Sequence, residues 1–204
     1  MEYLFIVVVL VFSVVLHEVS HGVMANYLGD PTAKNAGRLT LNPIPHLDIL
    51  GSVILPLFLI LSRVGIVFGW AKPVPINPYN FRDQKYGEAK VAIMGPLANL
   101  SLALVFGLAL RFFPITVSNI GLASLFSYIV FINIILAVFN LVPIPPLDGS
   151  HVLFTFLPRT MGNLKMFLYR YGSFVLLFMV FFWFEWITVA ANFIFRLITG
   201  FPLS

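Results

Sequence analysis

Two histidines and one glutamate stand close enough in the sequence to do chemistry together, in the stretch His17-Glu18-Val19-Ser20-His21. In a helix, His17 and His21 lie four residues apart and therefore share one face. Two imidazoles so placed can hold one metal ion, and Glu18 can reach a water molecule on that metal. This H-E-x-x-H spacing is typical of zinc sites in which the glutamate acts as a general base.

The segment that carries this motif is apolar, because residues 3–16 hold no ionisable carboxylate, amine or imidazole and Ser13 is their one small polar side chain. An alternative interpretation is a pair of histidines at the membrane interface. Ionisable groups inside a membrane helix are expensive and are usually functional. Three of them within five residues would be costly without a metal, which favours the metal site.

The composition indicates an integral membrane protein. Of the 204 residues, 60% are hydrophobic and 10% are charged, whereas a soluble domain has about 25% charged residues. At about 20 residues per span, the length suits four to six spans in one membrane-embedded domain over residues 1–204. The chain has no cysteine, which excludes disulfides and thiolate ligands, and its net charge of +4 shows no nucleic-acid footprint.

Four apolar stretches are predicted to be transmembrane helices. They cover residues 3–27, 91–110, 120–141 and 172–195. The first resembles a signal peptide, but it lacks a basic start and a cleavage site, so we expect it to be retained. Residues 150–171 are basic and are expected to lie at the membrane interface.

Residues 49–67 allow two interpretations, a full span or a re-entrant, membrane-embedded β-hairpin. The positive-inside rule separates them, because a re-entrant segment leaves most of the cations on one side of the membrane. These cations are Lys34, Arg38, Arg63, Lys72, Arg82, Lys85, Lys90, Arg159, Lys165 and Arg170. We therefore predict an all-α polytopic membrane protein with four transmembrane helices plus this β-hairpin, five to six spans being the alternative. The metal site then faces the cytoplasm.

A catalytic zinc site needs a third protein ligand and one open position. The candidates are Asp148, His46, His151 and Asp48. Asp148 follows a proline-rich break at the end of a span, which can turn its carboxylate inward. An N-cap of the following helix is the alternative role for this residue. For the two histidines, interfacial or supporting roles are favoured over a role as ligand.

At this point the sequence resembles the site-2 protease family of intramembrane zinc metalloproteases, in its short form without a PDZ domain. The matching motifs are H-E-x-x-H-G at residues 17–22, G-P-x-x-N at 95–99 and N-x-x-P-x-P-x-L-D-G at 140–149. The stretches 38–43 and 69–75 also resemble short-form members. The motifs occur in order and cover most of the chain, and together they are far more specific than any one alone.

The resemblance implies that His17, His21 and Asp148 bind one Zn²⁺ and that Glu18 is catalytic. It also implies a membrane-embedded β-hairpin after the first span. Asn140 would help to engage an unwound substrate. Asn99 would instead pack or support the site.

The expected activity is that of a zinc-dependent intramembrane endopeptidase that cleaves transmembrane segments of membrane proteins. Regulated intramembrane proteolysis and clearance of signal-peptide remnants are the two settings that the resemblance implies. The partners are then a transmembrane protein substrate and the lipid bilayer, in a prokaryotic inner membrane. A metal-binding transporter and a catalytically silent scaffold of the same fold are the alternatives. Glu185, inside the last span, lines a water path or makes an interhelical hydrogen bond.

Overall fold

The protein is a set of long apolar helices in a computed structural model that describes residues 2–54, 58, 61–62, 71–113 and 120–202. Four helices of this described part are long and apolar enough to cross a membrane. They are α1 (Glu2–Tyr27), α4 (Gly87–Phe112), α6 (Ile120–Asn140) and α8 (Gly162–Thr199). The prediction of a helical membrane protein with four such helices is confirmed.

A helix is the expected form of these apolar stretches, because lipid offers no hydrogen-bond partner to an exposed backbone group. Helix α4 continues through Pro96, which lacks the N–H of an ordinary helical residue. Helix α8 ends at Gly200, whose positive φ of 87° suits glycine. Beside that end, Arg111 of α4 donates a hydrogen bond to the Leu197 carbonyl at 3.0 Å.

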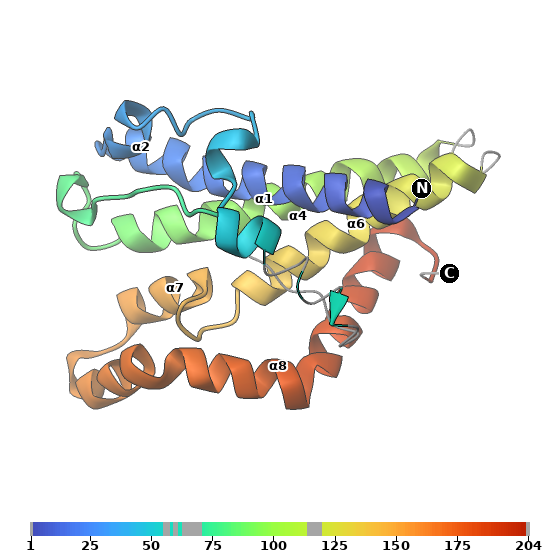
Figure 1. Ribbon diagram of the computed structural model, residues 1–204. Coiled ribbons are helices and arrows are strands. Elements are labelled where there is room, and N and C mark those ends of the chain that lie inside the picture. Colours follow the sequence, from blue (N-terminus) through green and yellow to red (C-terminus); the bar gives the residue numbers. More distant parts are fainter. Residues whose placement is uncertain (1, 55–57, 59–60, 63–70, 114–119, 203–204) are drawn as a thin grey trace.

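Helix α4 lies alongside both α1 and α6, and the second half of α8 turns toward the same end of the molecule as the two termini (Figure 1). A core of fully or nearly buried side chains joins α4, α6 and α8 there. It consists of Ala103, Leu110, Val130, Ile134, Ala191, Phe195 and Ile198. This packing fixes the helices on which the histidine motif must rest.

The short elements gather at the opposite end (Figure 1). They are α2 (Thr32–Asn35), η3 (Pro78–Asn80), α7 (Asp148–Phe156) and η4 (Arg159–Met161), whereas η1 (Ile44–His46) lies nearer the middle of α1 (Figure 1). Four basic residues lie in these elements or within three residues of them: Lys34, Arg38, Arg82 and Arg159.

The predicted β-hairpin over residues 49–67 is wrong where the structure describes that stretch. Residues Ile49–Ile54 form a π-helix, η2, and no strand occurs among the described residues. Residues 55–57, 59–60 and 63–67 lie outside the described part. The β-branched content that suggested strands is a weak, context-dependent signal. A helix, in contrast, satisfies its own backbone groups inside a membrane.

The last apolar helix also differs from its predicted bounds. Residues 150–171 were expected to be interfacial, yet α8 begins at Gly162 and runs without interruption to Thr199. Lys165 and Arg170 therefore lie within the helix. Long basic side chains can cover apolar surface while keeping their charge in water, and the Lys165 ammonium lies 5.4 Å from the ring centre of Phe154.

Candidate metal centre

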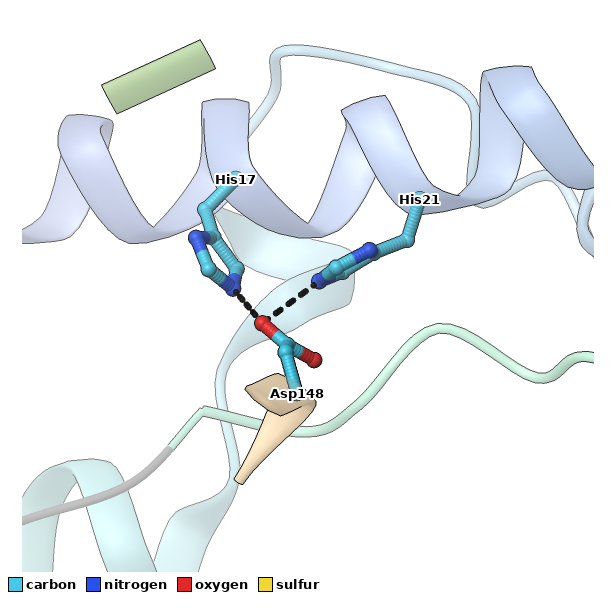
Figure 2. A group of neighbouring side chains, drawn as sticks. All are labelled: His17, His21 and Asp148. Carbon is cyan, nitrogen blue, oxygen red and sulfur yellow. Dashed lines mark ion pairs between the residues drawn. The ribbon is translucent and has the colours of Figure 1, made fainter. Parts of the chain in front are cut away.

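The two histidines of α1 and an aspartate far along the chain meet at one point (Figure 2). Nε2 of His17 lies 3.0 Å from Oδ2 of Asp148, and Nε2 of His21 lies 3.3 Å from the same oxygen. Both histidines are buried, at 5% and 6% exposure. One ligand atom from each of the three residues lies within 4.8 Å of the others.

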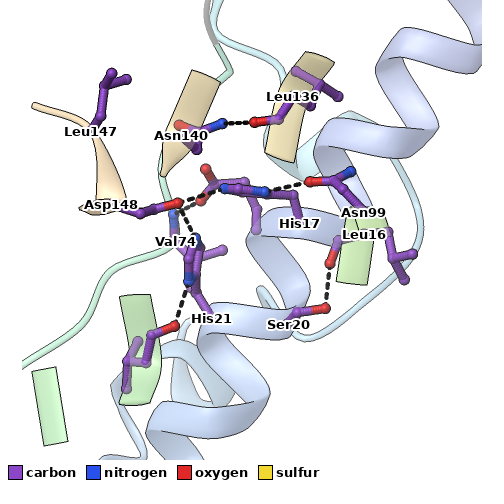
Figure 3. A network of polar contacts seen from close by, with 12 residues as sticks. Leu16, His17, Ser20, His21, Val74, Asn99, Leu136, Asn140, Leu147 and Asp148 are labelled. Carbon is purple, nitrogen blue, oxygen red and sulfur yellow. Dashed lines mark hydrogen bonds and ion pairs between the residues drawn. The ribbon is translucent and has the colours of Figure 1, made fainter. Parts of the chain in front are cut away.

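The second ring nitrogen of each imidazole, Nδ1, also has a hydrogen-bond partner (Figure 3). Nδ1 of His17 lies 2.6 Å from the side-chain oxygen of Asn99, and Nδ1 of His21 lies 2.8 Å from the Val91 carbonyl oxygen. Both partners are acceptors, so both Nδ1 atoms carry hydrogen. A metal-binding histidine typically donates its second ring N–H in this way.

The donor set fits a cation. With Nδ1 protonated, each Nε2 presents a lone pair toward the Asp148 carboxylate, so a proton or a metal ion must lie between them. Oδ2 of Asp148 is buried, and beyond these two imidazoles it has no hydrogen-bond partner in the described structure. Two imidazoles and one carboxylate are the ligands of a common class of catalytic zinc site, which keeps its fourth position open.

A glycine of α4 makes room for this group. An ideal Cβ on Gly95 would lie 2.4 Å from Nε2 of His21 and 2.6 Å from Nε2 of His17. Real Cβ atoms essentially never come that close to a neighbour. Only a residue without a side chain lets α4 approach both imidazoles here, which gives the Gly95-Pro96 pair a physical role at the site.

Asp148 reaches the histidines because the chain breaks after α6. That helix ends at Asn140 and α7 begins at Asp148, with Leu147 extended between them at φ −78° and ψ 154°. Ser150 donates hydrogen bonds to the Leu147 carbonyl from both its N–H (3.0 Å) and its hydroxyl (2.7 Å). Leu147, and not Asp148, is therefore the cap residue of α7, and the aspartate side chain makes no capping bond.

The turn around Asp148 is tightly packed and sets the charge of its carboxyl. A Cβ on Gly149 would lie 2.2 Å from the Leu141 carbonyl oxygen, so only glycine fits there. Burial alone would raise the pKa of Asp148, but hydrogen bonds and charge interactions with His17 and His21 outweigh it and lower that pKa to about 2. The carboxylate is therefore ionised at neutral pH and available to a cation.

Glu18 is held by the extended segment around Val74. Its Oε2 accepts a hydrogen bond from the Val74 N–H at 2.8 Å. Val74 stands between Pro73 and Pro75, so it carries the one backbone N–H of these three residues. The extended segment thus offers a single donor, and that donor faces the glutamate.

A buried arginine fixes this segment in place. Nη2 of Arg38 donates to the carbonyl oxygens of Lys72 (2.6 Å) and Pro73 (3.3 Å), and Arg38 is 7% exposed. Gly22 allows the same segment to close on α1, because a Cβ there would lie 3.0 Å from the Val74 side chain. The orientation of Glu18 therefore depends on loops rather than on another helix.

Two other candidate ligands lie outside the histidine–aspartate cluster. His46 is 1% exposed, and its Nε2 lies 3.0 Å from the Thr40 carbonyl oxygen. Asp48 accepts a hydrogen bond from the Gly51 N–H at 2.7 Å. Both residues hold local loop structure near η1 and η2.

Three further residues singled out in the sequence take different positions. Nδ1 of His151 lies 3.8 Å from Glu88, and both side chains are exposed. Asn140 is half-buried at the end of α6, where it donates to the Leu136 carbonyl (Figure 3). Glu185 is exposed on α8. None of these three belongs to the metal-ligand cluster found among the described residues.

Several residues that hold the site were not identified from the sequence. Asn133 is fully buried in α6 and is joined to Ser13 of α1, while Arg38 and Val74 hold Glu18 through the loops. Asn133 could have been singled out from the sequence, because it is a polar residue within an apolar predicted span, and polar residues inside membrane helices usually have a function. The contribution of Val74 is a backbone N–H, which side-chain motifs do not reveal.

Comparisons with known proteins agree with this geometry. The sequence pattern described as Peptidase family M50 matches residues 110–182. YwhC of Bacillus subtilis, described as a zinc metalloprotease, is 37% identical over 160 residues, which cover 76% of this chain and 69% of that protein. No solved structure gives a significant match.

More distant relatives carry similar descriptions. Rip2 of Mycolicibacterium smegmatis is 34% identical over 139 residues, covering 67% of this chain and 51% of Rip2. The zinc metalloprotease MJ0392 of Methanocaldococcus jannaschii is 32% identical over 94 residues, or 45% of this chain and 27% of that protein. Together with the four apolar helices, these matches show that the chain belongs to peptidase family M50, the site-2 protease family, and is a membrane zinc metalloprotease.

Proposed function

We propose that this protein is an intramembrane endopeptidase that cleaves transmembrane segments of other membrane proteins. The observation that carries the proposal is the meeting of His17, His21 and Asp148 beside Glu18, on a helix apolar enough to span a membrane. A hydrolytic site on such a helix is accessible to substrates that lie in the bilayer. Soluble proteases place the same kind of motif in an aqueous cleft.

His17, His21 and Asp148 would hold the zinc ion. Zinc, when bound, polarises a carbonyl group and lowers the pKa of a water molecule toward about 7. Glu18 accepts a proton on a carboxylate oxygen and returns it to the amide nitrogen that leaves. Because the Val74 N–H occupies Oε2, this assigns the proton to Oε1 of Glu18.

The substrate must lose its helical structure around the scissile bond, because helical amides are hydrogen-bonded internally. Asn140 stands at the end of α6, eight residues before Asp148 along the chain break. We assign to its amide the role of binding the unwound substrate backbone. Regulated intramembrane proteolysis and removal of signal-peptide remnants are the two processes that need this activity.

The orientation follows from the charge asymmetry between the two ends of the bundle. Basic residues concentrate at the end with α2, α7 and η4, whereas the termini lie at the other end (Figure 1). The positive-inside rule makes the basic end cytoplasmic. The zinc site then opens toward the cytoplasm of a prokaryotic cell.

Glu18→Gln tests the proposal directly. The amide cannot accept the proton, so cleavage of a fluorescent transmembrane substrate in proteoliposomes should fall about 100- to 10,000-fold, the usual contribution of general acid–base catalysis. Zinc content should stay at one ion per chain, because Glu18 is not a ligand. Glu185→Gln is the matched control and should cleave normally, since that side chain is exposed on α8.

Three outcomes would overturn the proposal. Undiminished cleavage by Glu18→Gln would remove Glu18 as the general base. Zinc uptake into the vesicles by both wild type and Glu18→Gln, with no cleavage by either, would instead identify a transporter that uses the same ligands. If the wild type neither takes up zinc nor cleaves the substrate, the protein is a catalytically silent scaffold.

A further inference from the structure

Behind the metal centre, a chain of buried polar groups crosses three helices. Asn99 of α4 and Asn133 of α6 are both 0% exposed, and Ser13 of α1 is 2% exposed. Nδ2 of Asn99 donates to Oδ1 of Asn133 at 2.8 Å and to the Ser13 carbonyl at 3.2 Å. Nδ2 of Asn133 donates to the Ser13 hydroxyl at 2.9 Å and to the Ile129 carbonyl at 2.8 Å.

This network fixes which way the Asn99 amide points. Its NH₂ group faces two acceptors, one of which is a backbone carbonyl that cannot donate. Turning the amide over would place its oxygen against both acceptors and leave its NH₂ group against His17. The oxygen of Asn99 is therefore held toward Nδ1 of His17, 2.6 Å away.

The Asn99 orientation in turn selects the ring nitrogen that His17 offers to a metal. An acceptor at Nδ1 keeps hydrogen on Nδ1 and leaves the lone pair on Nε2, which faces Asp148. With the amide turned over, Nδ1 would have to accept, and hydrogen would move to Nε2. That tautomer cannot bind a cation through Nε2.

We propose that Asn133 is a positioning residue for the zinc site, because it prevents the Asn99 amide from turning over and so keeps Nε2 of His17 available to the metal. Asn133 touches neither the histidines nor Asp148 through any hydrogen bond of the described structure. It acts two steps away, through Asn99. The inference rests on the proposed zinc-binding role of His17.

The test is the zinc affinity of purified full-length protein, measured by competition with a chelator of known affinity. Asn133→Leu keeps the size of the side chain but removes the acceptor for Asn99. Zinc should bind about tenfold more weakly, the lower end of the 10- to 100-fold loss found for outer partners of metal ligands. Asn99→Leu removes the acceptor for His17 itself and should weaken zinc binding by up to about 100-fold.

A double variant separates positioning from general damage. If Asn133 acts only through Asn99, adding Asn133→Leu to Asn99→Leu should change zinc affinity less than about twofold, because neighbours in one network are not additive. Ile134→Ala, at a fully buried apolar neighbour, is the packing control. It should lower the melting temperature and leave zinc affinity unchanged.

The contrary results are equally specific. Multiplying losses in the double variant, or an equal loss in Ile134→Ala, would reduce Asn133 to a packing residue. If Asn133→Leu does not fold, Ser13→Ala carries the test, because it removes only the hydroxyl that Asn133 donates to. Unchanged zinc affinity in Ser13→Ala would then overturn the inference, whereas a wild type that binds no zinc would overturn the zinc site itself.

Discussion

The two imidazoles and the two carboxylates of the metal centre are supported by different kinds of structure. His17 and His21 are held by Asn99 and Val91, which belong to the neighbouring helix α4. We call this support the helix side. Glu18 and Asp148 are held by irregular segments, residues 72–75 and 141–147, which we call the loop side.

The difference has an energetic basis. On the helix side each buried polar atom must find a partner inside the bundle, because an unpaired one costs about 1–3 kcal/mol. The positions of the ring nitrogens are thereby tied to the packing of α1, α4 and α6. On the loop side, Glu18 is held by the single backbone N–H of Val74, and Asp148 is placed by the turn at Leu147. Neither segment belongs to a membrane-spanning helix.

The helix side and the loop side suit different functions. A rigid helix side suits metal ligands, whose geometry must stay fixed, and a loop side suits a general base that must receive and release a proton. Asp148 combines both, since it is a proposed ligand carried by a turn that Gly149 makes tight. A variant on the helix side should therefore affect zinc first, and a variant on the loop side should affect cleavage first.

Gly95→Ala is the strongest test of the helix side. The added methyl group would lie within 2.6 Å of Nε2 of both His17 and His21, so an imidazole or α4 itself must move. Zinc affinity should fall at least about 100-fold, since losing an outer partner alone costs 10- to 100-fold. Zinc retained after dialysis, measured by atomic absorption, checks this.

Gly162→Ala is the control for that change. It also adds one methyl group near a membrane helix, but a Cβ there would meet nothing within 4 Å. Zinc content should match the wild type. Full zinc occupancy in Gly95→Ala would mean that the helix side rearranges as easily as a loop. The proposed difference between the helix side and the loop side would then be wrong.

The helix side is also the part that the sequence predicts well. The apolar length of the four spans predicts helices, and the four-residue spacing of His17 and His21 predicts a shared face. Burial of both imidazoles follows once α1 is packed. The hydrogen-bond partners of the imidazoles do not follow, because the sequence does not determine the register of α4 against α1. Asn99 could therefore be given only a general supporting role, and Asn133 could not be identified.

Val74→Pro tests the loop side. The substitution removes the N–H that Oε2 of Glu18 accepts, and a hydrogen bond to a charged group contributes about 1.5–3 kcal/mol. We expect kcat for a transmembrane substrate to fall about tenfold, with zinc affinity unchanged. Single-turnover cleavage and chelator competition on the same preparation measure both quantities.

Val74→Ala separates the N–H from the side chain, because it shortens the residue and keeps the donor. It should cleave within about threefold of the wild type, because shortening this buried side chain loses some packing but leaves the hydrogen bond to Glu18 intact. Faster cleavage by Val74→Pro would show that the bond restrains Glu18 instead of positioning it. Loss of zinc in Val74→Pro would show that the helix side and the loop side are energetically coupled and act as one unit.

The loop side was largely out of reach of sequence analysis. The expected β-hairpin at residues 49–67 begins as the π-helix Ile49–Ile54, since β-branched content alone does not determine a strand. Residue chemistry alone left Asp148 among four possible third ligands, and the family resemblance selected it, because nothing in the sequence sets the distance across the 127 residues between it and His21. The Val74 contact depends on a backbone atom, and such atoms are the same in every residue except proline.

The smallest effect is expected at Asp30, which anchors the segment that follows residues 72–75. This fully buried carboxylate accepts hydrogen bonds from the Asn77 N–H (2.7 Å) and the Asn80 side chain (2.8 Å). Burial opposes the charge and would raise the pKa of Asp30, but its hydrogen bonds with Thr32, Asn77 and Asn80 outweigh burial and lower it. The carboxylate therefore stabilises the fold above its unfolded pKa, about 3.9, and loses that contribution as the pH falls through the lower folded value.

Asp30→Asn places an amide where Asn77 needs an acceptor, so it should lower the melting temperature at pH 6 by a few degrees. Toward pH 3 and below, the wild type loses the same stabilisation, and the difference in melting temperature between the two proteins should shrink. Asp83→Asn is the control, since that half-buried carboxylate pairs with the exposed Lys90 ammonium and should give a smaller difference at pH 6. If the difference in melting temperature between Asp30→Asn and the wild type stays constant with pH, then neutral packing, and not the ionised carboxylate, holds residues 77–80 in place.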